Sequence, residues 1–355
     1  MQRRTICKLM ATLPWFGASL LSRHAVAQVP AKAVPVISPL RTIEIQPELE
    51  TAEPPVLTAV AVSPNGQVIA AAGDDHRVRI WNVADGTLSA ELHGHTDWVR
   101  AVSFSSSGKQ LLTAGDDRTI KLWDLSSGTV TRSIENASGV LHRSLFLPDG
   151  KQFASSGFDN KVRLYDAASG ASVHEFECTG DDVRALAVSP TGRHLAAAGR
   201  DGVLRIWNLA DKKQIAEAPA HRMRIRVLAY SPDGEQFVTA GDDRKFFLWK
   251  ADGTRDATLA PPPGRLMSAV FLGNDRLAVG GSDNLIRILD PVTRQELQHA
   301  AGHTGSVASL DYFADTGLLV SASYDTTVRL WKPEGGKSPN QVTQRPATTA
   351  APLKK

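Results

Sequence analysis

Three groups of residues in this sequence combine a histidine, a hydroxyl side chain and an aspartate, the types that act together in nucleophilic and acid–base catalysis. In each group the Asp follows the His by 22 residues, and a Trp ends the group. The groups are His95, Thr113, Asp117 and Trp123; His221, Thr239, Asp243 and Trp249; and His303, Ser321, Asp325 and Trp331. Because the same set recurs at fixed spacing, we expect it to be structural.

The Asp and the Trp of each group belong to a phrase that occurs seven times. Each copy begins with Asp and ends six residues later, at Trp81, Trp123, Tyr165, Trp207, Trp249, Leu289 or Trp331. Successive end positions are 42 residues apart, with a single interval of 40. Such a period indicates a repeat architecture. We place the repeats near 57–92, 93–134, 135–176, 177–218, 219–259, 260–301 and 302–332.

The pattern inside each repeat has a period of two, which is typical of strands. In the second repeat, residues 99–105, 109–115, 118–123 and 129–134 alternate and are separated by Ser, Gly and Asp turns. One meander of this kind cannot bury both faces, whereas seven in a ring can. We therefore expect an all-β, seven-bladed β-propeller of four-stranded antiparallel blades. Because no strand pattern follows Trp331, the N-terminal strand 40–46 is expected to close the ring by pairing with the seventh repeat.

The sequence resembles the WD40-repeat family over about residues 57–331. The Trp-Asp pair stands at Trp123–Asp124, and a Gly-His pair at Gly94–His95 and Gly302–His303. The resemblance implies that the three groups above are hydrogen-bonded tetrads. Repeats 1, 3, 4 and 6 lack the His, so we expect apolar packing to hold them, with repeat 6 the weakest. Basic residues on the third strands are interpreted as a solvated structural face: Arg79, Lys121, Arg163, Arg205, Arg287 and Arg329.

A partner-binding site is expected where the innermost strands begin, which the resemblance places near the mouth of the central channel. The aligned residues are Thr58, Arg100, Arg143, Arg184, Arg226, Ser268 and Ala308. The resemblance also places the residue before each turn Asp on this face: Asp74, Asp116, Phe158, Arg200, Asp242, Ser282 and Tyr324. We expect Asp116 and Asp242 to pair with the arginines of their own blades.

The candidate partner-binding residues are Arg100, Arg143, Phe158, Arg184, Arg200 and Arg226. Within this set, Arg143, Arg184 and Arg200 are expected to form an unpaired basic patch that docks an acidic partner segment through bidentate guanidinium contacts. The alternative is that these arginines pair with acids from other loops and are simply solvated.

The two ends of the chain differ from the repeats. Residues 1–27 have a basic start, a short apolar run and a small-residue cleavage site, which predicts a secretory signal peptide. The paired Arg3 and Arg4 resemble a twin-arginine signal, so we expect bacterial export to the periplasm or the medium. Residues 28–39 are expected to be a linker, and residues 333–355 a disordered basic tail.

The composition of the chain excludes several classes of function. The whole chain has a net charge of +3, but residues after 27 include 36 basic and 37 acidic side chains, a net charge of −1. That balance argues against a nucleic-acid binder, and no segment is apolar enough for a transmembrane span. With two Cys and no zinc-site spacing, we expect no metal, cofactor or catalytic residues. The expected protein is a monomeric scaffold for an acidic protein partner; the alternatives are a periplasmic hydrolase or dehydrogenase, or a small-anion-binding sensor.

Overall fold

The computed structural model describes residues 34–45, 53–135 and 139–335, and these residues contain strands β1 to β29 and no helix. The strands form seven sheets. The expected signal peptide and most of the expected tail lie outside the described residues. No helix among the described residues is long and apolar enough to cross a membrane.

Each sheet is one blade, and its strands follow the chain from the centre outward, except that the N-terminal strands β1 and β2 lie at the outer edges of blades 6 and 7. The innermost strands of blades 1 to 7 are β3 (Leu57–Val62), β7 (Val99–Phe104), β11 (Leu141–Phe146), β15 (Val183–Val188), β19 (Ile225–Tyr230), β23 (Leu266–Phe271) and β27 (Val307–Phe313). The second strands are β4 (Val68–Gly73), β8 (Gln110–Gly115), β12 (Gln152–Gly157), β16 (His194–Gly199), β20 (Gln236–Gly241), β24 (Leu277–Gly281) and β28 (Leu318–Ser323).

The third and outer strands complete the blades. The third strands are β5 (Val78–Asn82), β9 (Thr119–Asp124), β13 (Lys161–Asp166), β17 (Val203–Asn208), β21 (Phe246–Lys250), β25 (Ile286–Leu289) and β29 (Thr327–Trp331). The outer strands of blades 1 to 6 are β6 (Leu88–Leu92), β10 (Thr129–Glu135), β14 (Ser172–Glu177), β18 (Gln214–Pro219), β22 (Arg255–Leu259) and β26 (Glu296–Ala300).

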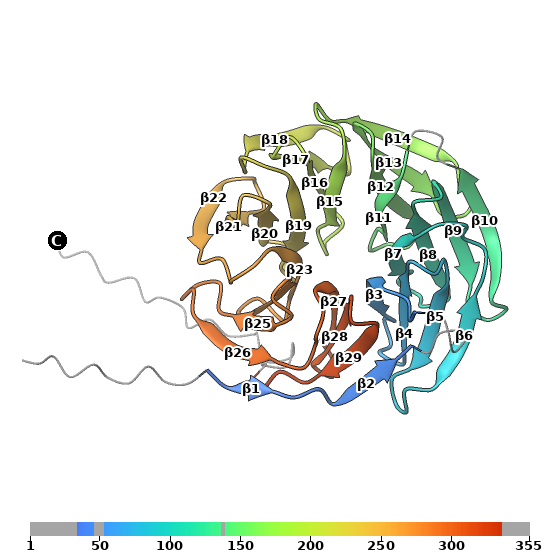
Figure 1. Cartoon of the computed structure of the whole chain (residues 1–355). Coiled ribbons are helices and arrows are strands. Elements are labelled where there is room, and N and C mark those ends of the chain that lie inside the picture. Colours follow the sequence, from blue (N-terminus) through green and yellow to red (C-terminus); the bar gives the residue numbers. More distant parts are fainter. Residues whose placement is uncertain (1–33, 46–52, 136–138, 336–355) are drawn as a thin grey trace, which may run out of the picture. The chain divides into compact units, whose positions relative to one another are not determined.

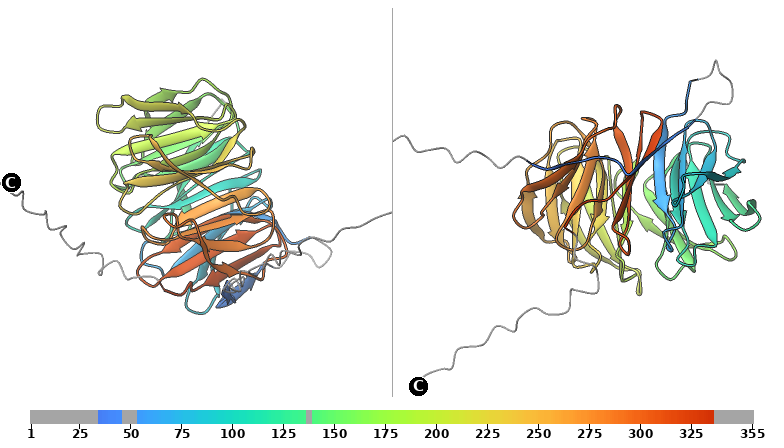
Figure 2. Two further views of the ribbon diagram at one scale, coloured as in Figure 1. Left: turned by 90° about the vertical axis from the view of Figure 1, so that its left-hand side faces the viewer. Right: turned by 90° about the horizontal axis from the view of Figure 1, so that it is seen from below.

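The blades form a closed ring in chain order (Figure 1). Each innermost strand packs beside the next, and β27 of blade 7 packs beside β3 of blade 1. The views in Figure 2 show the blades as twisted sheets standing side by side around the ring. The expected seven-bladed propeller is therefore confirmed.

The ring is closed by the N-terminal strand β2 (Arg41–Glu44), as expected. β2 is the outer strand of blade 7 and pairs antiparallel with β29, with Ile43 opposite Val328. The side chain of Ile43 joins Leu57, Val328 and Leu330 in a buried cluster. The first and last parts of the propeller thus share one blade and one core cluster.

A second N-terminal strand extends blade 6. β1 (Val36–Ile37) pairs parallel with β26, and the His299 amide donates to the Pro35 carbonyl at 3.0 Å. These residues were expected to belong to the linker; instead they cover the free edge of β26, which would otherwise be an exposed row of peptide groups.

The first residues of the expected tail also lie on blade 6. The backbone carbonyl of Glu334 accepts from Arg276 Nη1 at 2.7 Å and from Gln298 Nε2 at 2.9 Å. The Glu334 amide donates to Gln298 Oε1 at 3.1 Å. Disorder from residue 333 onward was therefore wrong for residues 333–335, because two polar side chains of blade 6 bind the backbone there.

The core lies between neighbouring blades. Between blades 1 and 2, Leu92, Val99, Leu111 and Trp123 form one buried cluster. The large side chains at the ends of the third strands fill these interfaces, and Trp123 is only 1% exposed. Burial of such side chains between sheets supplies most of the stability of a packed β-fold.

Candidate partner-binding face

The structure joins the four side chains of each expected tetrad. In blade 2, His95 Nδ1 lies 2.7 Å from Asp117 Oδ2, and His95 Nε2 lies 2.7 Å from Thr113 Oγ1. The Trp123 indole N–H donates to the same hydroxyl at 2.8 Å. The groups around His221 and His303 repeat these contacts at 2.7–2.9 Å.

The tetrads are buried, and the hydrogen bonds within them keep their Asp carboxylates ionised. The His95 side chain has no exposed surface, and hydrogen bonds from His95 and from neighbouring amides outweigh burial to lower the pKa of Asp117 to about 2. The hydroxyl of Thr113 donates to Nε2 and accepts from Trp123, so all polar atoms are used. These side chains hold strands together and are closed to a substrate.

Blades without the histidine use a different device. In blades 1, 3, 4 and 6 the turn Asp pairs at 2.5–2.9 Å with an arginine four residues later: Asp75–Arg79, Asp159–Arg163, Asp201–Arg205 and Asp283–Arg287. A glutamate of the outer strand contacts each of these arginines at 2.9–3.6 Å: Glu91, Glu175, Glu217 and Glu296.

These four arginine side chains are only 2–13% exposed. The expectation that apolar packing alone holds these blades was therefore wrong, and so was the solvated face expected for this set. Where no His binds the turn Asp, a guanidinium group neutralises that carboxylate and ties the turn to the outer strand.

Two expected ion pairs are present at the channel mouth. Arg100 Nε donates to Asp116 Oδ1 at 2.9 Å in blade 2, and Arg226 Nη2 donates to Asp242 Oδ2 at 3.1 Å in blade 5. The guanidinium of Arg100 also lies 4.3 Å from the ring centre of Trp98.

The expected alignment of Arg143 with Arg100 was wrong by one residue. Arg143 pairs with Ser156 in the sheet, whereas in blade 2 it is Ala101 that pairs with Ala114 at this position. The true equivalent of Arg100 is His142. Each innermost strand has a β-bulge after its first residue, which obscures the alternation that a sequence alignment uses. The constant distance of eight residues to the turn glycine, from Arg100 to Gly108 and from His142 to Gly150, is the signal that identifies it.

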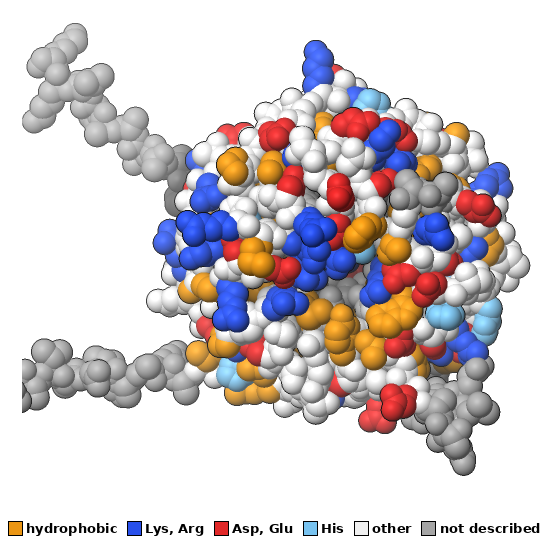
Figure 3. Space-filling view, turned by 45° about the horizontal axis from the view of Figure 1, so that its top comes forward, with side chains coloured by type: hydrophobic (Ala, Val, Ile, Leu, Met, Phe, Trp, Pro, Cys, Tyr) orange, Lys and Arg blue, Asp and Glu red, His pale blue; other side chains and the backbone are white. Residues whose placement is uncertain are grey.

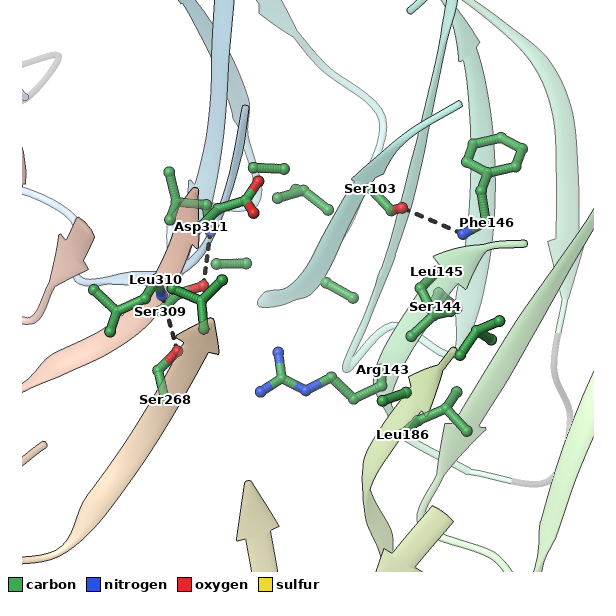
Figure 4. Close-up of a pocket in the computed structure, with 18 of the residues that line it drawn as sticks. Ser103, Arg143, Ser144, Leu145, Phe146, Leu186, Ser268, Ser309, Leu310 and Asp311 are labelled. Atoms are coloured by element: carbon green, nitrogen blue, oxygen red, sulfur yellow. Dashed lines mark hydrogen bonds between the residues drawn. The ribbon is translucent and has the colours of Figure 1, made fainter. Parts of the chain in front are cut away.

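The same correction applies in blade 6. Ser268 pairs with Gly280, so Met267 is the equivalent of Arg100 there. Arg143 and Ser268 instead lie one step further along their strands, where they line the channel interior (Figure 4).

Arg184 is paired, contrary to expectation. Its Nε donates to Asp182 Oδ1 at 2.8 Å, and Arg224 Nη2 lies 2.8 Å from Asp182 Oδ2. His142 Nε2 lies 2.9 Å from Asp182 Oδ1. The Asp182 carboxylate has no exposed surface, and contacts with His142 and Arg184 outweigh burial to lower its pKa to about 2.

Asp182 is the functional residue that sequence analysis missed. Acids were sought only before the turn Asp, but Asp182 precedes the innermost strand of blade 4. Its backbone has a φ of +66°, in the left-handed region. That conformation is more accessible to Asp than to most residues and turns the side chain into the cluster.

A second carboxylate, Asp242, completes a charged cluster over blades 4 to 6. Arg226 binds it as above, Arg265 Nε lies 3.3 Å from Oδ1, and Arg224 Nη1 lies 4.0 Å from Oδ2. Four guanidinium groups therefore share the two carboxylates of Asp182 and Asp242. Figure 3 shows Lys and Arg side chains gathered around a hollow near the middle of this face, with acidic side chains among them.

Arg200 adds a further positive charge. It is exposed, and no ion pair joins it to any other described residue. We call Arg184, Arg200, Arg224, Arg226 and Arg265 the arginine face.

Apolar side chains accompany these charges. Phe158 is 50% exposed, and its ring packs edge-on against His142 with the centroids 6.3 Å apart. Tyr324, from blade 7, is 40% exposed. Both line a hollow of about 360 Å³ at the channel mouth together with Arg100, Arg184 and Arg226. No group of three or more His, Cys, Asp or Glu among the described residues is placed to hold a metal ion.

Comparison with known families matches these repeats. The family model described as "WD domain, G-beta repeat" matches residues 47–82, 86–124, 128–166, 170–208, 212–250 and 294–332. Those ranges cover more than half of the chain. Residues 251–293, which contain the inner three strands of blade 6, fall between two matches.

Three relatives are similar to this chain over short segments. A segment of 58 residues, 15% of this chain, is 45% identical to 8% of the probable serine/threonine-protein kinase PkwA of Thermomonospora curvata. Another of 52 residues, 15% of this chain, is 44% identical to 6% of cell division control protein 4 of Saccharomyces cerevisiae. A third of 49 residues, 14% of this chain, is 43% identical to 14% of the Set1 complex component swd2 of Schizosaccharomyces pombe.

The chain thus spans only a small part of each of these relatives. Their likeness reflects shared repeats and says nothing of a shared activity. The repeat matches, the seven blades and the three tetrads agree with one another, and the chain belongs to the WD40-repeat family.

Proposed function

We propose that this protein is an exported, monomeric, non-catalytic scaffold that binds an acidic segment of a protein partner on its arginine face. The observation that favours this function is the excess of cations over blades 4 to 6. Asp182 and Asp242 offer two negative charges to Arg184, Arg224, Arg226 and Arg265. Carboxylates from a partner would complete the bidentate contacts that these guanidinium groups leave open.

The surroundings of the arginine face suit a protein ligand. Arg200 is unpaired among the described residues and exposed, so it can bind a carboxylate without losing an internal partner. Phe158 offers exposed apolar area beside the charges. An aromatic side chain next to arginines is the composition enriched at the centres of protein interfaces.

The rest of the molecule supports a scaffold. The His, Asp and hydroxyl groups of the tetrads are buried and fully hydrogen-bonded, which leaves them no part in catalysis. Two relatives have names that place them in assemblies, the Set1 complex component swd2 and the U3 snoRNP-associated protein-like EMB2271 of Arabidopsis thaliana. Export rests on the signal peptide expected at residues 1–27.

Crosslinking affinity capture from the native host tests this function. The bait would be the full chain, compared with the Arg200→Glu/Arg265→Glu variant, whose changes avoid the buried Asp182 contacts. We expect the wild type to capture a partner, the crosslinked segment to be acidic, and the variant to lose at least nine-tenths of the capture.

A charge-matched control keeps the result specific. Lys109→Glu/Arg193→Glu makes the same change in net charge in the turns between first and second strands, at the opposite end of the blades. The control should capture the partner as the wild type does. Equal capture by all three proteins, or a crosslinked segment without acidic residues, would refute the arginine face as the binding site.

A further inference from the structure

The channel interior contains one residue that departs from the repeat. Seven equivalent positions on the innermost strands line the larger channel cavity: Ala59, Ala101, Arg143, Ala185, Val227, Ser268 and Ser309. Six of them are small or aliphatic and uncharged. In a repeat protein, a residue type that the fold requires recurs at the equivalent position of every blade. A long, positively charged side chain in a single blade is therefore not required by the fold.

Three other polar residues of the channel wall have a structural explanation. Ser309 Oγ accepts from the Val60 amide at 3.2 Å, and Asp311 Oδ2 accepts from the Val62 amide at 2.7 Å. Ser268 Oγ accepts from the Leu310 amide at 2.9 Å. Each innermost strand has a free edge, and these side chains satisfy amides of the neighbouring blade. Figure 4 shows the bond between Ser268 and Leu310.

Arg143 has no such partner. Its guanidinium projects from blade 3 into the open channel, toward the side on which Ser268 and Asp311 lie (Figure 4). No hydrogen bond or ion pair joins it to another described residue, and burial lowers its pKa from the ordinary 12.5. Arg143 is half-buried and has no counter-charge among the described residues, so a bound anion would gain a charge-assisted contact there.

The channel has room for such an anion. Arg143 lines both the hollow of about 360 Å³ at the mouth and a deeper cavity of about 530 Å³. Arg226 also lines both, but Asp242 neutralises it. Cavities of a few hundred Å³ suit small molecules, and the planar guanidinium matches an oxyanion in two hydrogen bonds.

We propose that the central channel binds a small oxyanion, a carboxylate or a phosphate, held by Arg143. The ligand enters through the mouth, and its charged group meets the guanidinium where the two cavities adjoin. Ser268 and Ser309, on the facing wall, offer hydroxyl groups to the remainder of the ligand. This site is independent of the proposed partner, because it lies inside the channel of the isolated propeller.

The test is a titration of the purified full chain with succinate and, separately, with inorganic phosphate. Isothermal calorimetry and thermal unfolding are measured at pH 7 with ionic strength held constant by sodium chloride. We expect at least one of the two probes to give saturable binding and a higher unfolding temperature. The probe that binds more tightly identifies the class of oxyanion.

Arg143→Ala is the decisive variant, because blades 1, 2 and 4 already have Ala at the equivalent position. Loss of the charged bidentate contact should weaken binding by about tenfold to a hundredfold. In the same buffer without succinate or phosphate, the variant should unfold at a temperature no lower than the wild type. Arg193→Ala, which removes an exposed arginine outside both cavities, should bind as the wild type does.

Two results would overturn the channel site: no saturable response to either probe, or the same affinity in Arg143→Ala as in the wild type. The Arg200→Glu/Arg265→Glu variant separates this site from the partner-binding one, because it should lose the protein partner and keep the small anion.

Discussion

Asp201 Oδ2 lies 2.9 Å from Arg205 Nη2, and the Arg205 side chain is only 2% exposed. The same pair occurs in the four blades that lack the tetrad histidine and is absent from the three that have it. The turn Asp therefore always has a buried cationic or hydrogen-bonding partner, and the blades differ in which residue supplies it.

Replacing Arg205 with Met should destabilise the propeller. The substitution keeps an unbranched side chain in place but removes the buried counter-charge of the Asp201 carboxylate, which is itself 20% exposed. We expect a loss of about 2–4 kcal/mol in the free energy of urea unfolding. Lys121→Met changes the equivalent position in blade 2, where His95 holds the turn Asp, and should cost less than 1 kcal/mol. Equal losses in the two variants would show that the buried pair has no special role.

The sequence predicted the architecture well because repetition averages out local ambiguity. Seven copies of one phrase establish the period, the strands and the tetrads. The pairing of Asp201 with Arg205 was not predicted, although an arginine follows the turn Asp by four residues in every repeat that lacks the His. The position of Arg143 was missed because a bulge shifts the alternation, although the spacing to the turn glycine identifies it. The role of Asp182 could not be found, because two of its partners come from blades 3 and 5.

Thr113 is expected to be the most sensitive residue of the blade 2 tetrad. Thr113→Val keeps the shape but leaves His95 Nε2 and the Trp123 indole N–H without a partner in a site with no solvent access. The free energy of unfolding should fall by about 2–4 kcal/mol in a urea titration. Ser155→Ala, at the equivalent position of blade 3, serves as control and should change it by less than 1 kcal/mol. A similar small effect at Thr113 would contradict the structural role of the tetrad.

Asp182 should contribute stability that depends on pH. Its pKa is about 2 in the folded protein, below the ordinary 3.8, so its contribution is complete above about pH 4 and is lost as the pH falls toward 2. Asp182→Asn should lower the free energy of unfolding by about 2 kcal/mol at pH 7 and much less at pH 2. Asp181→Asn, at the exposed neighbour, should have little effect at either pH. A loss at Asp182 that does not change with pH would point to packing instead of charge.

Ile43 should contribute to stability, because it lies in the strand that completes blade 7 and its side chain packs in a buried cluster. Ile43→Ala leaves a void beside Val328 and Leu330 and should cost about 2–4 kcal/mol in the free energy of unfolding. Val36→Ala, in the other N-terminal strand, is the control, because Val36 is 60% exposed. Hydrogen exchange should also show faster exchange of the β29 amides in the Ile43 variant. If the β29 amides stayed protected from exchange and the free energy of unfolding did not change, the packing of Ile43 would contribute nothing to the closure of the ring.

The effect of Asp311 on the pH dependence of stability should be opposite to that of Asp182. Burial outweighs the bonds from the Val62 and Tyr312 amides and raises its pKa to about 6. Below pH 3.8 the carboxyl is protonated in both the folded and the unfolded chain. Between pH 3.8 and 6 the unfolded chain releases the proton first, so the propeller loses stability as the pH rises, by up to about 3 kcal/mol.

Asp311→Asn removes this proton and with it the pH dependence. The difference in unfolding free energy between wild type and variant, measured in urea at pH 4, 5, 6 and 7, should shift in favour of the variant up to pH 6 and then level off. Asp256→Asn, at an exposed carboxylate, should show a constant difference. A constant difference for Asp311 as well would mean that its two amide bonds offset burial fully, and that the channel wall holds a negative charge at no cost even below pH 6.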